Sequence, residues 1–213
     1  MNISPDKPRE LLANADRYHE AYYRVETFGG PSLYFHQRSL DTRRSPASLS
    51  HLEYVYATLS SWGMHRMGPG GSKMRSFSAF HASVEPIRDK IAMAQQLTVS
   101  AIDDAGWALL KEIFQGINIM ASGTSLVGNS KVMHHMLPNI VPPIDREYTL
   151  RYLCGNTNIA NNLDKEWKTM MDIIGGFFIP VATEAASCEC YKVTANLLRA
   201  AVARRPGPKA RAK

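Results

Sequence analysis

The chain has 213 residues, of which 45% are hydrophobic and 21% charged, so it can bury a proper core as one large domain or two small helical lobes. It has no apolar run near the roughly 20 residues that span a bilayer and no signal-peptide pattern at its start. Its three cysteines are a small, odd number, which does not suit a disulfide framework. We therefore expect a cytoplasmic protein without a membrane partner. Its net charge of +6 is weak evidence for nucleic-acid binding, because residues 204–213 alone hold five basic residues and no acid, so that the rest of the chain is nearly neutral.

The first half of the chain shows helical periodicity and almost no strand alternation. Residues 9–25 carry apolar side chains at three- to four-residue spacing, which predicts one helix. Residues 32–47 are expected to be irregular, and Ser50 with Glu53 forms a capping box for a helix through Leu59. The glycine-rich residues 62–73, WGMHRMGPGGSK, predict a loop that is mobile or approaches another group closely.

Further helices are predicted through the second half. They cover residues 76–84, a segment after Pro86 to residue 97, a longer one from Ser100, and one from Asp145 to Cys154. Asp164 is expected to begin another that ends at Gly175 and Gly176, and residues 182–204 form the last, after a break at Pro180. The expected fold is all-α, with roughly eight helices.

The predicted domain organisation has two helical lobes with a cleft between them. Residues 1–97 form the N-terminal lobe and residues 98–203 the C-terminal lobe. Residues 204–213, RRPGPKARAK, are expected to be a disordered basic tail, which either reaches phosphates or only aids solubility.

Residues 126–152, LVGNSKVMHHMLPNIVPPIDREYTLRY, carry the most specific pattern. Gly128 is expected in a turn between two helices, where backbone amides can bind a DNA phosphate. Lys131 falls in the first turn of the next helix. Three prolines exclude helix from the link that follows, and Asp145 is then placed as an N-cap. A lysine and a carboxylate held in this way can be a nucleophile and its electrostatic partner.

This order of residues resembles the helix-hairpin-helix DNA glycosylases, whose hairpin L-P-G-V-G-x-K is followed by V-P-x-D at the head of a helix. The corresponding segments here are LVGNSK, residues 126–131, and VPPID, residues 141–145. Val127 stands in place of the hairpin proline, the second glycine is missing, and Lys131 and Asp145 are 14 residues apart, an interval shorter than in lyase members. WGMHRMG, GNSK and PPIDREYT also resemble segments of uncharacterised bacterial proteins, which assigns no function.

The glycosylase resemblance implies an all-α fold of two lobes with a base-flipping cleft, and DNA as the partner. Lys131 would attack the sugar anomeric carbon and form a Schiff base, and Asp145 would stabilise positive charge on the sugar as the base leaves. No iron–sulfur cysteine set follows, and we expect no cofactor.

Other residues are candidates for contact with nucleic acid because aromatic side chains stack on bases and cations bind the backbone. The candidates are Tyr34, His36, Arg38, Trp62, His65, Arg66, Lys73, Gly128, Asn129, Ser130 and His134. Trp62 could equally fill the core. His134 and His135 point about 100° apart on a helix, and without H-x-x-x-H spacing no metal site is expected.

The function predicted is that of a DNA-binding protein related to base-excision glycosylases and lyases, which removes a damaged or modified base through Lys131 and Asp145. Two alternatives remain open. One is a non-catalytic helical module that binds nucleic acid, and the other is a protein-interaction domain in which these residues are scaffold.

Overall fold

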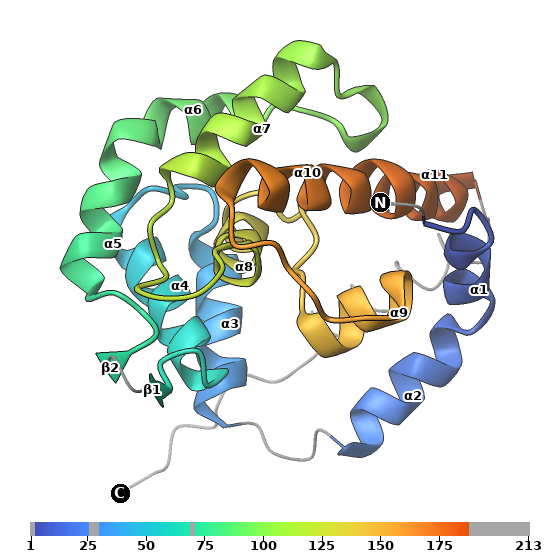
Figure 1. Ribbon diagram of the computed structural model, residues 1–213, viewed down its shortest axis with the longest axis horizontal. Coiled ribbons are helices and arrows are strands. Elements are labelled where there is room, and N and C mark those ends of the chain that lie inside the picture. The colour runs from blue at the N-terminus through green and yellow to red at the C-terminus, as the bar shows by residue number, and fades with distance from the viewer. Residues whose placement is uncertain (1–2, 26–29, 69–70, 188–213) are drawn as a thin grey trace, which may run out of the picture.

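The computed structural model describes residues 3–25, 30–68 and 71–187, and the predicted tail lies outside these ranges. Within them the fold is all-α, as predicted. The strands of this part are β1 (Met67–Gly68) and β2 (Gly71–Ser72), a short antiparallel pair in which Met67 lies opposite Ser72. Figure 1 shows the helices arranged around α8 (Leu126–Met136). No helix in the described ranges is both long and apolar enough to cross a bilayer.

The N-terminal helices differ from the prediction in two places. The expected helix over residues 9–25 is divided at Asn14 into α1 (Lys7–Ala13) and α2 (Ala15–Val25). The prediction that residues 32–47 are irregular is wrong, because α3 (Pro31–Thr42) occupies most of them. Its proline stands in the first turn, where a missing N–H costs nothing. The next helix, α4 (Leu49–Ser61), is capped by Ser48 rather than Ser50.

The middle of the chain follows the predicted caps more closely. Ser76 caps α5 (Phe77–Val84), as expected, and Asp103 caps α7 (Asp104–Gly116), which therefore begins later than Ser100. The elements between them are the 3₁₀ turn η1 (Glu85–Ile87), α6 (Arg88–Ala94) and the 3₁₀ turn η2 (Val99–Ala101).

The C-terminal half contains two π-helical turns. Asp145 caps the first, η3 (Arg146–Leu150), which continues into α9 (Arg151–Cys154). This helix ends at Gly155, which has a φ of +69°, and so its two ends agree with the prediction of a helix from Asp145 to Cys154. Asn162, and not Asp164, caps α10 (Leu163–Ile173). The expected ends at Gly175 and Pro180 are wrong, because the second π turn, η4 (Ile174–Phe178), joins α10 to α11 (Ile179–Ser187).

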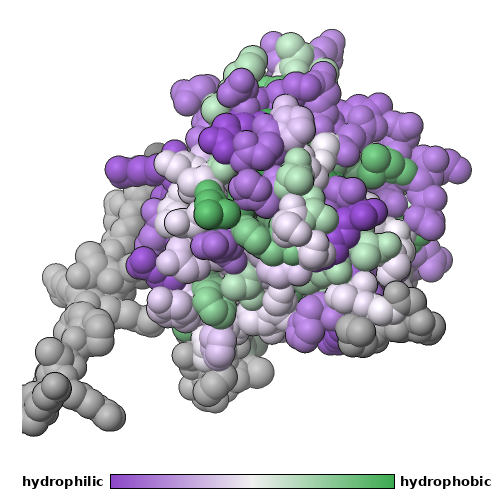
Figure 2. Space-filling view, turned by 90° about the vertical axis from the view of Figure 1, so that its left-hand side faces the viewer, coloured by the Kyte–Doolittle hydropathy of each residue, from purple (hydrophilic) through white to green (hydrophobic). Residues whose placement is uncertain are grey.

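The hydrophobic core is one cluster of buried side chains that runs along the chain from Ala47 to Ile174, with Phe80 and Phe114 among the largest. Helix α8 packs against α4, α7 and α10, and α6 packs against α7 across the predicted lobe boundary at residue 97. The division into two lobes stays a prediction. On the face in Figure 2, hydrophilic side chains predominate and hydrophobic ones form small patches, as expected when most large apolar groups are in the core.

Candidate functional site

The candidate site is centred on Lys131 and Asp145, which the tertiary structure brings into direct contact. The Nζ of Lys131 lies 3.3 Å from Oδ2 of Asp145. The Lys131 side chain is only 12% exposed and that of Asp145 is 35% exposed. Both line a pocket of about 460 Å³, which we call the lysine pocket. Its other lining residues are Trp62, Gly63, Met64, Arg66, Lys73, Met120, Ser122, Gly123, Thr124, Val127, Arg146 and Glu147.

Asp145 is held on both sides by its own helix terminus. Its Oδ1 accepts hydrogen bonds from the backbone N–H of Glu147 at 2.9 Å and of Tyr148 at 3.5 Å, and its own N–H donates to Thr149 Oγ1 at 3.0 Å. Burial by itself raises the pKa of the Asp145 carboxyl, but the Glu147 N–H and the charge of Lys131 outweigh it, so the pKa lies below its usual value. Asp145 is therefore an anion at neutral pH. Its helix begins with the π turn η3, an irregularity frequent at functional sites.

Lys131 is positioned by the buried first turns of α8. Glu166 is 2% exposed, and its Oε2 accepts the backbone N–H of Leu126 at 2.6 Å, which satisfies a free donor at the start of α8. Asn129 is 1% exposed and donates from Nδ2 to the carbonyls of Phe114 and Ile117, at 2.8 and 3.0 Å. These bonds attach α8 to α10 and to the end of α7, and leave Lys131 on the side that faces the pocket.

The predicted turn between two helices at Gly128 is wrong, because residues 126–130 are the first turns of α8 itself. Gly128 is needed for a close approach: a Cβ there would lie 2.7 Å from Met120 Cγ and 2.9 Å from Ile119 Cγ2. Gly128, Asn129 and Ser130 are buried, and so they have no surface to offer a nucleic acid. Their role in this structure is to support Lys131.

Trp62 forms a wall of the lysine pocket beside the ammonium group. The Nζ of Lys131 lies 5.6 Å from the centre of its ring, within the range of a cation–π contact. Helix α4 ends here in a Schellman motif: the N–H of Gly63 donates to Ser60 and that of Met64 to Leu59. Gly63 has a φ of +76°, which favours glycine, and the turn at this position sets the direction of the chain beyond Trp62.

Two histidines, the partly buried His36 of α3 and the buried His135 of α8, support Trp62. The His36 and His135 rings lie 5.9 and 5.6 Å from the Trp62 ring. His135 Nδ1 donates to the carbonyl of Lys131 at 2.7 Å, since a carbonyl can only accept. Its Nε2 must then accept from His36 Nδ1, 3.2 Å away. This hydrogen-bond chain fixes the tautomer of both rings.

Burial keeps His135, His36 and a third histidine, His51 of α4, neutral. It lowers the pKa of His135 to about 3, despite the hydrogen bond to Lys131, and that of His51 to about 4. The pKa of His36 is lowered by burial as well. His134, predicted to contact nucleic acid, is partly buried, donates from Nδ1 to the carbonyl of Val141 at 2.8 Å, and also has a pKa lowered by burial. It does not line the lysine pocket.

Cationic side chains line the lysine pocket around the Lys131–Asp145 pair. Arg66 and Lys73 line it and form no side-chain hydrogen bond or ion pair with any residue in the described ranges. Arg146 is anchored by bonds to Thr124 Oγ1 at 2.9 Å and to the Thr157 carbonyl at 3.1 Å. Arg146 was not among the predicted site residues, although its place directly after the predicted cap was a usable signal.

Four further predicted contact residues do not line this pocket. His36 supports Trp62 from behind. Tyr34 is 55% exposed on α3, and Arg38 on the same helix pairs with Asp41 at 3.2 Å and lies over the Tyr54 ring. His65 is exposed beside the pocket wall and donates from Nδ1 to the Ser60 carbonyl at 2.6 Å. Among the predicted residues, the structure therefore brings together Lys131, Asp145, Trp62, Arg66 and Lys73.

The arrangement joins an amine, an anion, an aromatic wall and free cations in one pocket. Within the described part of the chain, no three His, Cys, Asp or Glu side chains are placed to hold a metal ion. We compared the chain with models of protein families, with curated proteins and with solved structures, and found no match in any of the three comparisons.

Proposed function

We propose that the protein is a DNA base-excision glycosylase with lyase activity, in which Lys131 is the nucleophile and Asp145 its electrostatic partner. The observation that carries this proposal is the 3.3 Å contact between Nζ and Oδ2 inside a pocket of about 460 Å³. Placement of the two side chains on opposite faces would have contradicted it. The choice of DNA as substrate comes from the order of Lys131, the prolines and Asp145, which resembles that of helix-hairpin-helix glycosylases; the hairpin itself adds no support, because residues 126–130 are helical.

The reaction requires an amine that can form a covalent bond with a sugar. Lys131 releases its proton to solvent and its lone pair attacks C1′, while the bond from C1′ to the base breaks and the base leaves with the electron pair and gains a proton. The C1′–O4′ bond then opens with a proton to O4′, which leaves an iminium between C1′ and Nζ. Loss of a C2′ proton breaks the C3′–O bond and cleaves the strand. Asp145, as an anion, stabilises the positive charge at C1′ in the first step.

The remaining lining of the lysine pocket suits a nucleotide taken out of a duplex. Trp62 provides a flat surface on which a base can stack, and stacking of this kind tolerates any base. Arg66 and Lys73 are free to bind the flanking phosphates, which hold the strand in place without reading its sequence.

A second candidate is a module that binds nucleic acid without chemistry. It is favoured by the same two cations, Arg66 and Lys73, since neither pairs with a side chain in the described part of the chain while Lys131 is engaged by Asp145. Binding to phosphates alone would make the affinity fall steeply with salt, whatever residue stands at position 131.

Trapping with borohydride separates these possibilities. The wild-type protein is incubated with duplexes that carry an abasic site, uracil or an oxidised purine, and borohydride reduces any Schiff base to a stable adduct. We expect an adduct that is lost in Lys131→Gln and retained in Lys165→Gln, a control that removes an exposed lysine of α10. Absence of an adduct on every lesion, or an equal adduct in Lys131→Gln, contradicts the lyase proposal.

Base release tests the role of Asp145. Asn at this position keeps an oxygen for the N–H groups of Glu147 and Tyr148 but removes the charge next to Lys131. We expect Asp145→Asn to release the base at least tenfold more slowly than wild type, with DNA binding unchanged. Salt-dependent binding without base release or adduct in the wild type would favour the non-catalytic module.

A further inference from the structure

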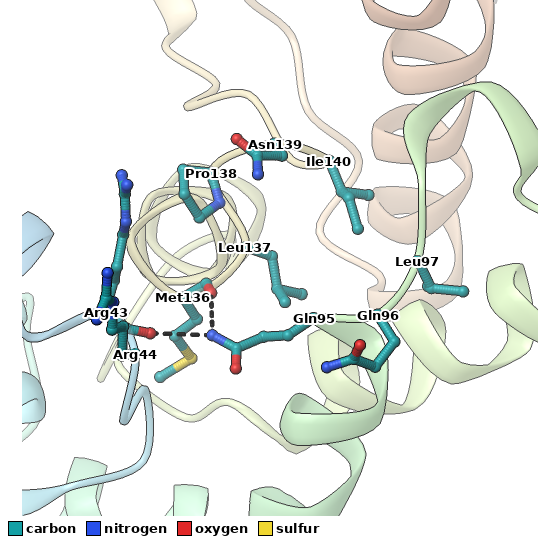
Figure 3. A pocket seen from close by; sticks show the side chains of 10 residues that line it. All are labelled: Arg43, Arg44, Gln95, Gln96, Leu97, Met136, Leu137, Pro138, Asn139 and Ile140. Carbon is teal, nitrogen blue, oxygen red and sulfur yellow. Dashed lines mark hydrogen bonds between the residues drawn. The ribbon is translucent and has the colours of Figure 1, made fainter.

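We propose that a second pocket, where the C-terminal ends of α3, α6 and α8 meet, binds a nucleotide through a terminal phosphate. This arginine pocket has a volume of about 330 Å³, within the range of small-molecule sites. Figure 3 shows its lining residues, which are Arg43, Arg44, Gln95, Gln96, Leu97, Met136, Leu137, Pro138, Asn139 and Ile140. None of them takes part in the lysine pocket.

Gln95 ties the three helix ends together and closes one side of the arginine pocket. Its Nε2 donates to the carbonyl of Arg43 at 2.9 Å and to the carbonyl of Met136 at 3.3 Å. Arg43 follows the last residue of α3, Met136 is the last residue of α8, and Gln95 itself follows α6. The pocket is therefore held by hydrogen bonds between elements far apart in the sequence.

The charge at one side of the arginine pocket is positive and unpaired. Arg43 and Arg44 are exposed, and neither guanidinium forms an ion pair or hydrogen bond with a residue in the described ranges. No acidic side chain is among the described residues that line the pocket. Two guanidinium groups present planar sets of donors that match phosphate oxygens, and a phosphate monoester carries about −1.5 to −2 charges at neutral pH. A carboxylate offers one charge and two oxygens to the two guanidinium groups, whereas a phosphate monoester offers nearly two charges and three oxygens.

The side of the arginine pocket opposite the two arginines combines apolar side chains with the amide of Gln96. In Figure 3, Leu97 and Ile140 stand across the pocket from the two arginines, with Pro138 between the two sides. The side-chain amides of Gln96 and Asn139 lie along the lining, and amides of this type pair with the edges of bases. A ligand with a phosphate at one end and a flat, partly apolar ring at the other fits this distribution, and a nucleotide has both.

A purely structural role for the two arginines makes a different prediction. Helix C-termini carry partial negative charge, and cations placed near them stabilise the helices. In that role Arg43 and Arg44 would contribute to folding stability but would bind no ligand. Direct binding measurements therefore decide between the two roles.

Calorimetric titration with nucleoside 5′-monophosphates tests the proposal on the full chain. The four common monophosphates are compared with the matching nucleosides and with inorganic phosphate, and then with short single strands that end in a 5′-phosphate or a 5′-hydroxyl. We expect at least one phosphorylated compound to bind at least tenfold more tightly than inorganic phosphate and than its unphosphorylated counterpart. Preference for the free monophosphates or for the 5′-phosphorylated strand identifies the source of the nucleotide.

Two double variants with the same loss of charge provide the comparison. Arg43→Gln/Arg44→Gln is expected to weaken nucleotide binding at least tenfold, whereas Arg17→Gln/Lys165→Gln, which removes two exposed cations elsewhere, leaves it unchanged. No binding in the wild type, or equal weakening in both double variants, overturns the proposal. The arginine pocket and the lysine pocket share no lining residue, so failure of the glycosylase proposal would leave this one standing.

Discussion

The hydroxyl of Ser130 accepts a hydrogen bond from the backbone N–H of Ile144 at 3.1 Å, and each of these residues stands next to one member of the Lys131–Asp145 pair. Ser130 is buried on α8, and Ile144 is buried directly before the cap of η3. This bond therefore fixes the distance between the amine and the carboxylate, although neither of its partners touches the pocket.

Replacement of Ser130 by alanine is expected to lower both stability and the yield of the Lys131 adduct. The substitution leaves the buried N–H of Ile144 without a partner, which costs about 1–3 kcal/mol in the free energy of unfolding. Ser83→Ala is the control. Ser130 and Ser83 each donate to the carbonyl three residues before them and accept a distant N–H, but the N–H of Asn118 that Ser83 accepts is exposed. Urea unfolding should show losses in both variants. An adduct reduced equally in both would contradict a specific role for Ser130.

Replacement of Gly128 by alanine should destabilise the protein, against the usual preference of helices for alanine. The new methyl group would overlap Met120 and Ile119, and such overpacking costs about 1–3 kcal/mol. At Gly175 the nearest atom to an added Cβ is 4.0 Å away, so Gly175→Ala should be neutral or stabilise by up to about 1 kcal/mol. Opposite shifts in the urea midpoint are the expected result, and a gain in stability at position 128 would disprove the tight contact.

Stability is expected to fall as the pH drops below about 6.5, the unperturbed pKa of histidine. The folded state holds His51 and His135 neutral, with pKa values of about 4 and about 3, whereas the unfolded chain binds a proton at each. The stability that these groups contribute is thus complete above pH 6.5 and is lost between there and pH 3–4, by roughly 3–5 kcal/mol for each group as an upper estimate. Urea midpoints measured from pH 7.5 to 4.5 check this. A slope unchanged in His51→Asn would exclude His51 as a source.

The two functions of Asp145 can be separated by the choice of substitution. Asp145→Ala removes the cap of η3 as well as the charge, and loss of an N-cap costs about 0.5–2 kcal/mol. Asp145→Asn keeps an acceptor for Glu147 and Tyr148 and should retain most of that stability while it loses base release. Thermal unfolding of both variants is the measurement. If the Asn and Ala variants melt at the same temperature, the capping bonds contribute little.

Local signals were enough for the helix ends at Ser76, Asp145 and Gly155, because a cap depends on residues within one turn of it. They placed the start of α7 at Ser100, three residues before its actual cap, Asp103. They failed over residues 32–47 and at Pro180. Pro31 is the first residue of α3, where no N–H is required, and the break predicted at Pro180 is absent because this residue directly follows η4 and Ile179 in continuous helix. The π turn η4, which places Pro180 there, had no signature that local rules could detect.

The sequence by itself determined the all-α class, the cap at Asp145 and the proline-containing link that returns Asp145 toward Lys131, because periodicity, capping and proline act over a few residues. Only the tertiary structure decided that Gly128 lies inside a helix, that Asn129 and Ser130 are buried supports, and that Trp62 and the histidine of α3 meet α8. These outcomes depend on side chains from Met120, Glu166 and His36, which lie outside the predicted motif and reach it through packing. A local pattern contains no information about which distant surface will cover it.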